Sequence, residues 1–307
     1  MTDPIATTRQ GTVRGFERHA LLNFRGIPYA RPPVGELRWA VAQPPEPWDG
    51  VRDATEYGPN SLQSSIASDI PLPPQPRRPM SEDCLYLNVV TPGLSGSRPV
   101  MVWIHGGSFT TGSGADFAGR QLAERGVVVV AMNYRLGALG SLALPALADR
   151  KGRFTNFGLR DQIAALRWVH DNIASFGGDP DNVTIFGESA GGLSVGSLLG
   201  SPEAKGLFHG AIPRAGLGQQ RQRDARAAGV RFCELLGVSR MTPGPADSRR
   251  GRHRCRIRCE GGREPDNCST PPPSLDDGVG PRRRRSVPSC ASDRRHSAGG
   301  GMARPYL

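Results

Sequence analysis

Residues 183–192 read Val183-Thr184-Ile185-Phe186-Gly187-Glu188-Ser189-Ala190-Gly191-Gly192. An apolar, β-branched run ends there in Gly-x-Ser-x-Gly and small residues follow, which is the strand–turn–helix setting of a nucleophile elbow. In such a turn the serine backbone is strained, and glycines flank it because a Cβ would collide with neighbouring backbone. The hydroxyl then lies at a helix start, where free N–H groups and the helix dipole favour negative charge. We therefore predict that Ser189 is a catalytic nucleophile; the alternative is a small-residue helix start without chemical meaning.

The rest of residues 1–238 alternates between strand and helix patterns. Continuous apolar runs at residues 100–104 and 127–132 indicate strands covered on both faces, as in parallel sheets. Helices are predicted over residues 120–125, 158–175, 189–200 and 226–236, and further strands over 81–90 and 207–212. This order predicts an α/β fold with a mostly parallel, doubly wound sheet. Ligands in such sheets bind at the carboxyl ends of the strands, which is where Ser189 falls.

Composition divides the chain into two parts. Residues 1–238 hold 24 Lys or Arg and 21 Asp or Glu, whereas residues 239–307 hold 15 Arg, no Lys and 7 Asp or Glu. The second part has 9 Pro and neither Phe nor Trp, so it cannot bury a core and we expect disorder. The sequence thus predicts a folded domain over residues 1–238 and an Arg-, Pro- and Gly-rich tail of low order over residues 239–307.

A second glycine-rich stretch predicts an oxyanion hole. His105-Gly106-Gly107 directly follows the strand predicted at residues 100–104, and a loop of this type lends backbone N–H groups to an oxyanion. Glycine suits the role because a side chain would block the approach of a substrate carbonyl. We predict N–H donors from Gly106 and Gly107, with Ala190 as the third. The alternative is an ordinary glycine turn after a strand.

Six stretches in a fixed order resemble the type-B carboxylesterases, the carboxylesterase/cholinesterase family of α/β-hydrolases. They are Gly26-Ile27-Pro28-Tyr29-Ala30, Glu82-Asp83-Cys84-Leu85-Tyr86-Leu87-Asn88-Val89, His105-Gly106-Gly107, Asn133-Tyr134-Arg135-Leu136-Gly137, Asn156-Phe157-Gly158-Leu159-Arg160-Asp161-Gln162 and Phe186-Gly187-Glu188-Ser189-Ala190-Gly191-Gly192. The resemblance implies an α/β-hydrolase fold and a serine carboxylic ester hydrolase. It further implies a small-molecule ester substrate, an acyl-serine intermediate and no cofactor, with Glu188 as an electrostatic neighbour of the nucleophile.

The resemblance stops short of a complete site. Family members are longer and take an orienting acid and a base histidine from the part after the nucleophile strand, in the order Ser, Glu, His. Here the tail stands in that place, and neither His253 nor His296 lies in the family's histidine context. His105 belongs to the oxyanion loop, and His170 and His209 are expected to be surface or structural residues. The expected fold is therefore truncated after its nucleophile half, with impaired or absent activity; a shifted reading frame after about residue 239 would explain the change.

The cysteines predict no disulfide and no metal site. The resemblance implies an upstream disulfide partner for Cys84, but Asn60-Ser61 stands near that position, so Cys84 is expected to be a free, buried thiol. In the tail, Cys255-x3-Cys259 near His253 matches no standard zinc-ligand spacing. No metal ligand is therefore assigned.

Three functions remain in competition. The first is an active ester hydrolase that completes its site in an unrecognised way or with another chain, and the second is a catalytically inactive, hydrolase-like binding domain. The third is nucleic-acid binding through Arg282-Arg283-Arg284-Arg285, which lacks interleaved aromatic residues for base stacking and is more simply a solvated charge run. Residues 1–10 show no signal peptide, and the longest purely apolar run, residues 127–132, is too short to cross a bilayer. We expect a cytoplasmic protein without a membrane partner.

Overall fold

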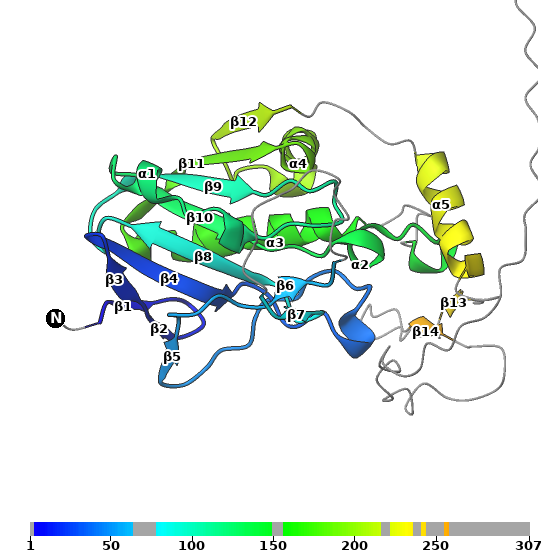
Figure 1. Ribbon diagram of the computed structural model, residues 1–307, viewed down its shortest axis with the longest axis horizontal. Helices are drawn as coiled ribbons and strands as arrows, with labels where there is room; N and C mark the ends of the chain where they lie inside the picture. Colours follow the sequence, from blue (N-terminus) through cyan, green and yellow to red (C-terminus); the bar gives the residue numbers. More distant parts are fainter. Residues whose placement is uncertain are drawn as a thin grey trace, which may run out of the picture. The chain divides into compact units, whose positions relative to one another are not determined.

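The computed structural model describes residues 3–63, 78–148, 156–215, 222–235, 241–243 and 255–257. Its centre is a seven-stranded sheet in the order β12-β11-β9-β10-β8-β4-β3, which Figure 1 shows running from yellow-green β12 to blue β3. The strands are β3 (Phe16–Arg18), β4 (Leu21–Pro28), β8 (Tyr86–Thr91), β9 (Arg98–Ile104), β10 (Val128–Met132), β11 (Gly178–Glu188) and β12 (Gly210–Arg214). β9, β10, β11 and β12 pair in parallel, whereas β8, β4 and β3 pair antiparallel. The predicted α/β-hydrolase architecture with its mostly parallel sheet is confirmed.

The predicted helices are present with small shifts of their ends. The α-helices are α1 (Arg120–Ala123), α2 (Gly137–Ser141), α3 (Phe157–Asn172), α4 (Ala190–Leu199) and α5 (Gln222–Leu235). Short 3₁₀ turns are η1 (Gly35–Leu37), η2 (Gly114–Asp116), η3 (Pro145–Leu147), η4 (Ile173–Phe176) and η5 (Pro202–Ala204). α3 begins where the Asn156 side chain accepts the Leu159 N–H at 3.0 Å, a helix cap that the sequence reasoning did not use. No helix in the described part of the chain is long and apolar enough to cross a membrane.

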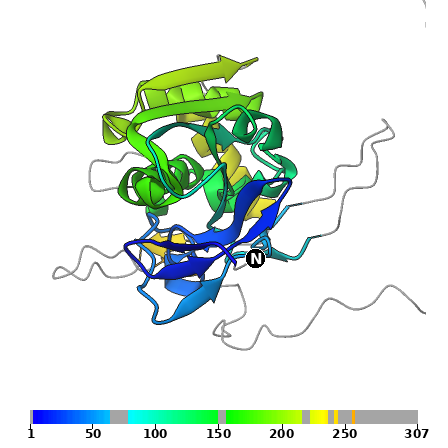
Figure 2. The same ribbon diagram turned by 90° about the vertical axis from the view of Figure 1, so that its left-hand side faces the viewer.

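The two faces of the sheet are covered unequally. Along β9 the side chains of Val100, Val102 and Ile104 are fully buried in the main core, which the apolar stripe of α3 completes. Figure 2 shows α3 (green) packed along the sheet. On the other face a smaller cluster joins the one-turn helix α1 to the sheet through Ala123 and Val129. The doubly wound arrangement is therefore strongly one-sided among the described residues.

The remaining strands form small sheets. β1 (Ile5–Thr7), β2 (Thr12–Arg14) and β5 (Val51–Asp53) form one, and β6 (Asn60–Ser61) pairs in parallel with β7 (Met80–Ser81). In the predicted tail, β13 (Met241–Pro243) pairs antiparallel with β14 (Cys255–Ile257), which the composition did not predict. The chain divides into the units Met1–Pro265 and Asp266–Leu307, and the second lies wholly outside the described residues. The predicted boundary at residue 238 and the disorder of the tail stay predictions, and His253, Cys259, Arg282–Arg285 and His296 also lie outside the described residues.

Cys84 is a free and buried thiol, as predicted. Burial raises the pKa of the Cys84 thiol to about 12, and the hydroxyl of buried Ser61 hydrogen-bonds to it and opposes that rise. Ser61 Oγ also accepts the Leu136 N–H at 3.2 Å. Ser61 thus lies within side-chain contact of Cys84, near the position where the resemblance implies a disulfide partner.

Replacing Ser61 with cysteine is expected to create a disulfide with Cys84. Because the bridge closes the loop between residues 61 and 84, it should raise the free energy of unfolding by about 3 kcal/mol. Urea denaturation with and without reductant measures this gain, and a thiol assay in denaturant should detect no free thiol beyond the five remaining cysteines. In the control Ser61→Ala no gain should appear. If the non-reduced Ser61→Cys variant instead shows seven free thiols, the side chains at positions 61 and 84 do not meet in the geometry that a disulfide requires.

Candidate active site

Ser189 occupies a strained turn between β11 and α4. Its backbone has φ 56° and ψ −121°, a conformation that costs a non-glycine residue about 1–3 kcal/mol. A Cβ on Gly187 would lie 2.6 Å from the Gly191 carbonyl carbon, and a Cβ on Gly191 would lie 2.1 Å from the Ile104 carbonyl oxygen. Only glycine fits at both positions. The sharp turn that the Gly-x-Ser-x-Gly pattern predicts is therefore present, and its serine is exposed to solvent.

The loop after β9 lies directly against this turn. Ile104 pairs with Gly187 in the parallel ladder, so β9 and β11 end at the same edge of the sheet. A Cβ on Gly106 would lie 3.4 Å from Ser189 Cβ and 2.7 Å from the Glu188 carbonyl oxygen. Gly107 has φ 97°, and its carbonyl oxygen accepts the Thr111 N–H at 3.0 Å, which closes the loop. The structure thus brings the predicted oxyanion loop and the predicted nucleophile side by side.

The side chain of His105 anchors the loop. Nδ1 lies 2.8 Å from the Gly106 carbonyl oxygen, and because a carbonyl can only accept, Nδ1 carries the proton. The ring stacks on Tyr134 at 4.3 Å between centroids, and the Tyr134 hydroxyl donates to the His105 carbonyl oxygen at 2.7 Å. Burial lowers the pKa of His105 to about 4, although the bond to Gly106 opposes this. His105 is therefore a buried, neutral anchor of the loop.

The remaining predicted site residues flank Ser189. Ala190 is buried and is the first residue of α4, where a backbone N–H has no acceptor within its helix. Glu188 is exposed at the last position of β11. The Ser189 N–H itself donates to the Arg214 carbonyl oxygen of β12 at 2.9 Å and is thereby occupied. Ala190 and Glu188 thus adjoin Ser189 in the chain, Gly106 contacts the turn and Gly107 lies in the same loop, while the roles predicted for these residues stay predictions.

A base for Ser189 is not found in the described part of the chain. The Ser189 hydroxyl makes no hydrogen bond there. His170 is exposed on α3 with Nδ1 3.3 Å from Asp171, and His209 is exposed with Nδ1 accepting the Val183 N–H at 3.2 Å. Both agree with the surface or structural roles predicted for them. His19, which the sequence reasoning did not consider, lies in the turn between β3 and β4, at the opposite edge of the sheet from β11.

One residue that supports the loop escaped the sequence reasoning. The Gln63 side-chain amide donates to the Gly112 carbonyl oxygen at 3.0 Å and accepts the Gly112 N–H at 2.8 Å, as a paired strand would. Gly112 in turn lies against the imidazole, since a Cβ there would be 2.4 Å from His105 Nδ1. Nothing in the sequence around Gln63 signals this contact, because its partner is 49 residues away.

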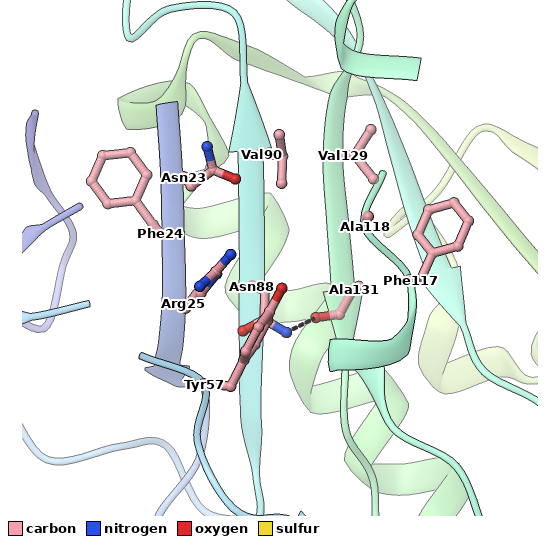
Figure 3. A pocket seen from close by; sticks show the side chains of 10 residues that line it. All are labelled: Asn23, Phe24, Arg25, Tyr57, Asn88, Val90, Phe117, Ala118, Val129 and Ala131. Atoms are coloured by element: carbon pink, nitrogen blue, oxygen red, sulfur yellow. Dashed lines mark hydrogen bonds between the residues drawn. The ribbon is translucent and has the colours of Figure 1, made fainter. Parts of the chain in front are cut away.

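A small groove on the less covered face of the sheet does not coincide with the Ser189 site. It is lined by residues of β4, β8 and β10 and by Tyr57, Phe117 and Ala118, and none of the predicted site residues borders it (Figure 3). Its volume of about 10 Å³ holds roughly one water molecule. Arg25 borders it, with its guanidinium 4.3 Å from the Tyr57 ring centre. No group of three metal-ligating side chains gathers anywhere in the described ranges.

Comparison with known proteins matches residues 2–246 to the model of the carboxylesterase family. The para-nitrobenzyl esterase of Bacillus subtilis is 46% identical over 244 residues, which are 78% of this chain and 49% of that protein. A human cocaine esterase is 49% identical over 229 residues, 70% of this chain and 40% of that protein. The chain thus spans about half the length, or less, of these curated relatives.

Solved structures agree with this match. A structure of PNB esterase superposes with a TM-score of 0.69 at 45% identity, over 78% of this chain and 49% of that chain. The juvenile hormone esterase of Manduca sexta superposes with a TM-score of 0.71 at 35% identity, over 78% of this chain and 47% of that chain. Each superposition therefore leaves about half of the known structure without a counterpart here.

Proposed function

This chain belongs to the carboxylesterase family, and we propose that it carries the nucleophile half of a serine ester hydrolase for small carboxylic esters. The observation that supports this most is the contact between Gly106 and Ser189, since a Cβ on that glycine would lie only 3.4 Å from Ser189 Cβ. Such closeness supports a site in which one ester carbonyl would meet both the hydroxyl and the loop amides. The names of the two relatives above, both esterases, support the same class of reaction.

In the proposed reaction Ser189 Oγ attacks the ester carbonyl carbon and gives its proton to a base. The carbonyl oxygen becomes an oxyanion that accepts hydrogen bonds from the N–H groups of Gly106, Gly107 and Ala190. The bond to the alcohol oxygen then breaks, the alcohol leaves with a proton, and an acyl group remains on Ser189. Water hydrolyses this acyl-serine to release the acid. Glu188 adds negative potential beside the turn, which favours the cationic form of any base that takes the proton.

Without a base the reaction is expected to be slow. In a comparable hydrolase, loss of one triad member costs on the order of a million-fold in rate, and the oxyanion hole and substrate binding leave weak residual catalysis. The absence of a histidine beside Ser189 in the described residues also supports a second candidate, a hydrolase-like domain that binds without catalysis. Adding a small base to the solution distinguishes the ester hydrolase from the binding domain.

Free imidazole is expected to accelerate p-nitrophenyl acetate hydrolysis by this chain, and Ser189→Ala is expected to abolish the acceleration. The reason is that Ser189 is exposed and its hydroxyl has no hydrogen-bond partner in the described residues, so a small base can reach it. After the rate with imidazole alone is subtracted, the rate of the natural chain should saturate as the p-nitrophenyl acetate concentration rises. The corresponding rate of Ser189→Ala should be zero. Peptide mass spectrometry should find an acetyl group on Ser189. Equal imidazole dependence of both proteins, with no acetylation, would favour the binding domain.

A further inference from the structure

The side-chain amide of Gln63 is held at three points. Its Oε1 accepts the Gly112 N–H at 2.8 Å, and its Nε2 donates to the Gly112 carbonyl oxygen at 3.0 Å and to the Ser61 carbonyl oxygen at 3.1 Å. Because an N–H can only donate and a carbonyl can only accept, the two Gly112 groups fix which end of the amide faces each of them. One side chain therefore occupies both backbone groups of Gly112 and limits how that residue can turn.

Gly112 lies against the hydrogen bond that anchors the loop after β9. A Cβ built on Gly112 would be 2.4 Å from His105 Nδ1 and 2.8 Å from the Gly106 carbonyl oxygen, the two atoms that this bond joins. The backbone of Gly112 has φ 112°, a conformation that glycine adopts without steric cost. Gly112 thus forms one wall of the space in which the imidazole and the carbonyl meet, and a shift of this wall would disturb their bond.

The same bond sets the direction of the Gly107 N–H. The Gly106 carbonyl and the Gly107 N–H belong to one peptide unit, which is planar and trans, since the described chain contains no cis peptide bond. In a trans unit the carbonyl and the N–H point in opposite directions. The Gly107 N–H therefore points away from His105 Nδ1, and it has no acceptor in the part of the chain that the structure describes. A ligand oxygen can take that place.

The segment that ends at Gln63 is itself tied to the rest of the fold. Asn60 Oδ1 accepts the hydroxyl of Ser113, the neighbour of the clamped glycine, at 2.7 Å. The Leu136 N–H donates to Ser61 Oγ at 3.2 Å, and β6 pairs with β7. The segment thus holds the loop at two successive residues, and the Gln63 amide extends from a backbone that is fixed on its own side.

We propose that Gln63 is a positioning residue, which fixes the direction of the Gly107 N–H for the oxyanion that forms when Ser189 attacks an ester. The inference rests on the proposed function. Gln63 acts through a series of contacts: its amide holds Gly112, that glycine supports the bond between the imidazole and the carbonyl, and that bond orients the next N–H. Without the amide the N–H can take several directions, and a donor that must be reoriented during the reaction stabilises the oxyanion less.

Gln63→Met tests this role, because methionine keeps the length of the side chain and removes all three hydrogen bonds. In the imidazole-dependent assay the rate of Ser189 acetylation at saturating p-nitrophenyl acetate should fall by about tenfold or more. The ester concentration at half-saturation should change by less than about twofold, because the donor acts on the transition state and not on the bound ester. Gln63→Asn, whose amide is one methylene too short to reach Gly112, should show the same loss and serves if the methionine variant does not fold.

Gln43→Met is the matched control. Gln43 is exposed, and its Nε2 donates to the Val41 carbonyl oxygen at 2.9 Å, outside the loop. This variant should keep both the saturating acetylation rate and the half-saturating ester concentration of the natural chain. Equal saturating rates for Gln63→Met and Gln43→Met would overturn the proposal.

Nuclear magnetic resonance tests the contacts without any reaction at Ser189. The Nδ1–H of the buried, hydrogen-bonded His105 should give a slowly exchanging signal in the natural chain. In Gln63→Met this signal should broaden or disappear, and the Gly112 N–H should exchange with solvent faster, because its acceptor is gone. Gln43→Met should change neither. An unchanged His105 signal in Gln63→Met would also overturn the proposal, since the anchoring bond would then not depend on Gln63.

The two measurements separate this inference from the proposed function. If the natural chain acetylates Ser189 and Gln63→Met does so equally fast, the positioning role is overturned while the function stands. If the natural chain does not acetylate Ser189 but the His105 signal is lost in Gln63→Met, the function is overturned while the coupling of Gln63 to the loop stands.

Discussion

Replacing Asp161 with alanine should lower the free energy of unfolding by about 3–5 kcal/mol. Asp161 is fully buried in α3 and pairs with Arg135 through two bonds, Nε to Oδ2 at 2.8 Å and Nη2 to Oδ1 at 2.7 Å. Burial raises the pKa of the Asp161 carboxyl, and the bonds from Arg135 oppose that rise. The substitution leaves the guanidinium buried without its counter-charge, which is costlier than the loss of the pair as a whole.

Urea denaturation measures this loss, and an exposed pair on the same helix supplies the control. Glu203 accepts two bonds from Arg160, at 2.8 Å and 3.2 Å, but its side chain is 45% exposed. Glu203→Ala should therefore cost at most about 1 kcal/mol. Replacing both partners, Arg135→Met with Asp161→Leu, should recover much of the loss because no buried charge remains. A loss for Asp161→Ala no larger than that for Glu203→Ala would refute the argument.

Gly191→Ala should distort the Ser189 turn and destabilise the protein by about 2 kcal/mol or more. The new Cβ would lie 2.1 Å from the Ile104 carbonyl oxygen and 3.0 Å from that of His105. Ile104 cannot withdraw, because β9 pairs with β10 on one side and β11 on the other. The turn must therefore move away from the loop, and imidazole-dependent acetylation of Ser189 should be lost with the stability.

Gly200→Ala is the matched control at the other end of α4. A Cβ there would meet its nearest atom at 3.8 Å, and the backbone has an ordinary φ of −88°. This substitution should be neutral or stabilise by about 0.4–1 kcal/mol, since alanine restricts the unfolded chain. Thermal unfolding and the acetylation assay, run side by side on Gly191→Ala and Gly200→Ala, test whether only the first substitution disturbs the turn. Unchanged acetylation in Gly191→Ala would show that the turn tolerates a side chain.

Local patterns were enough to predict the elements that position the site. The apolar run of β10, the alternation of buried Val100, Val102 and Ile104 in β9, and the helical spacing in α3 all reflect contacts with nearby residues of one element. Gly187 and Gly191 predicted the sharp turn at Ser189 because few other reasons require glycine on both sides of a serine. These signals lie within a few residues of each other, so a single sequence reveals them.

The errors arose where a boundary depends on the partner strand. Residues 207–212 were expected as a strand, whereas β12 is Gly210–Arg214, because its register is set by pairing with residues 184–188 of β11. The helix predicted over residues 226–236 begins earlier, at Gln222. Burial by a neighbour, and not the intrinsic preference of the segment, decides such ends.

By itself the sequence determined which stretches become strands, helices and tight turns, and which chemical groups they carry. Only the tertiary structure decided which groups meet: Gly106 with Ser189, Gln63 with Gly112, Asp161 with Arg135, and Ser61 with Cys84. The physical reason is that periodicity and backbone sterics act over a few residues, whereas these contacts follow from strand order and packing between distant segments.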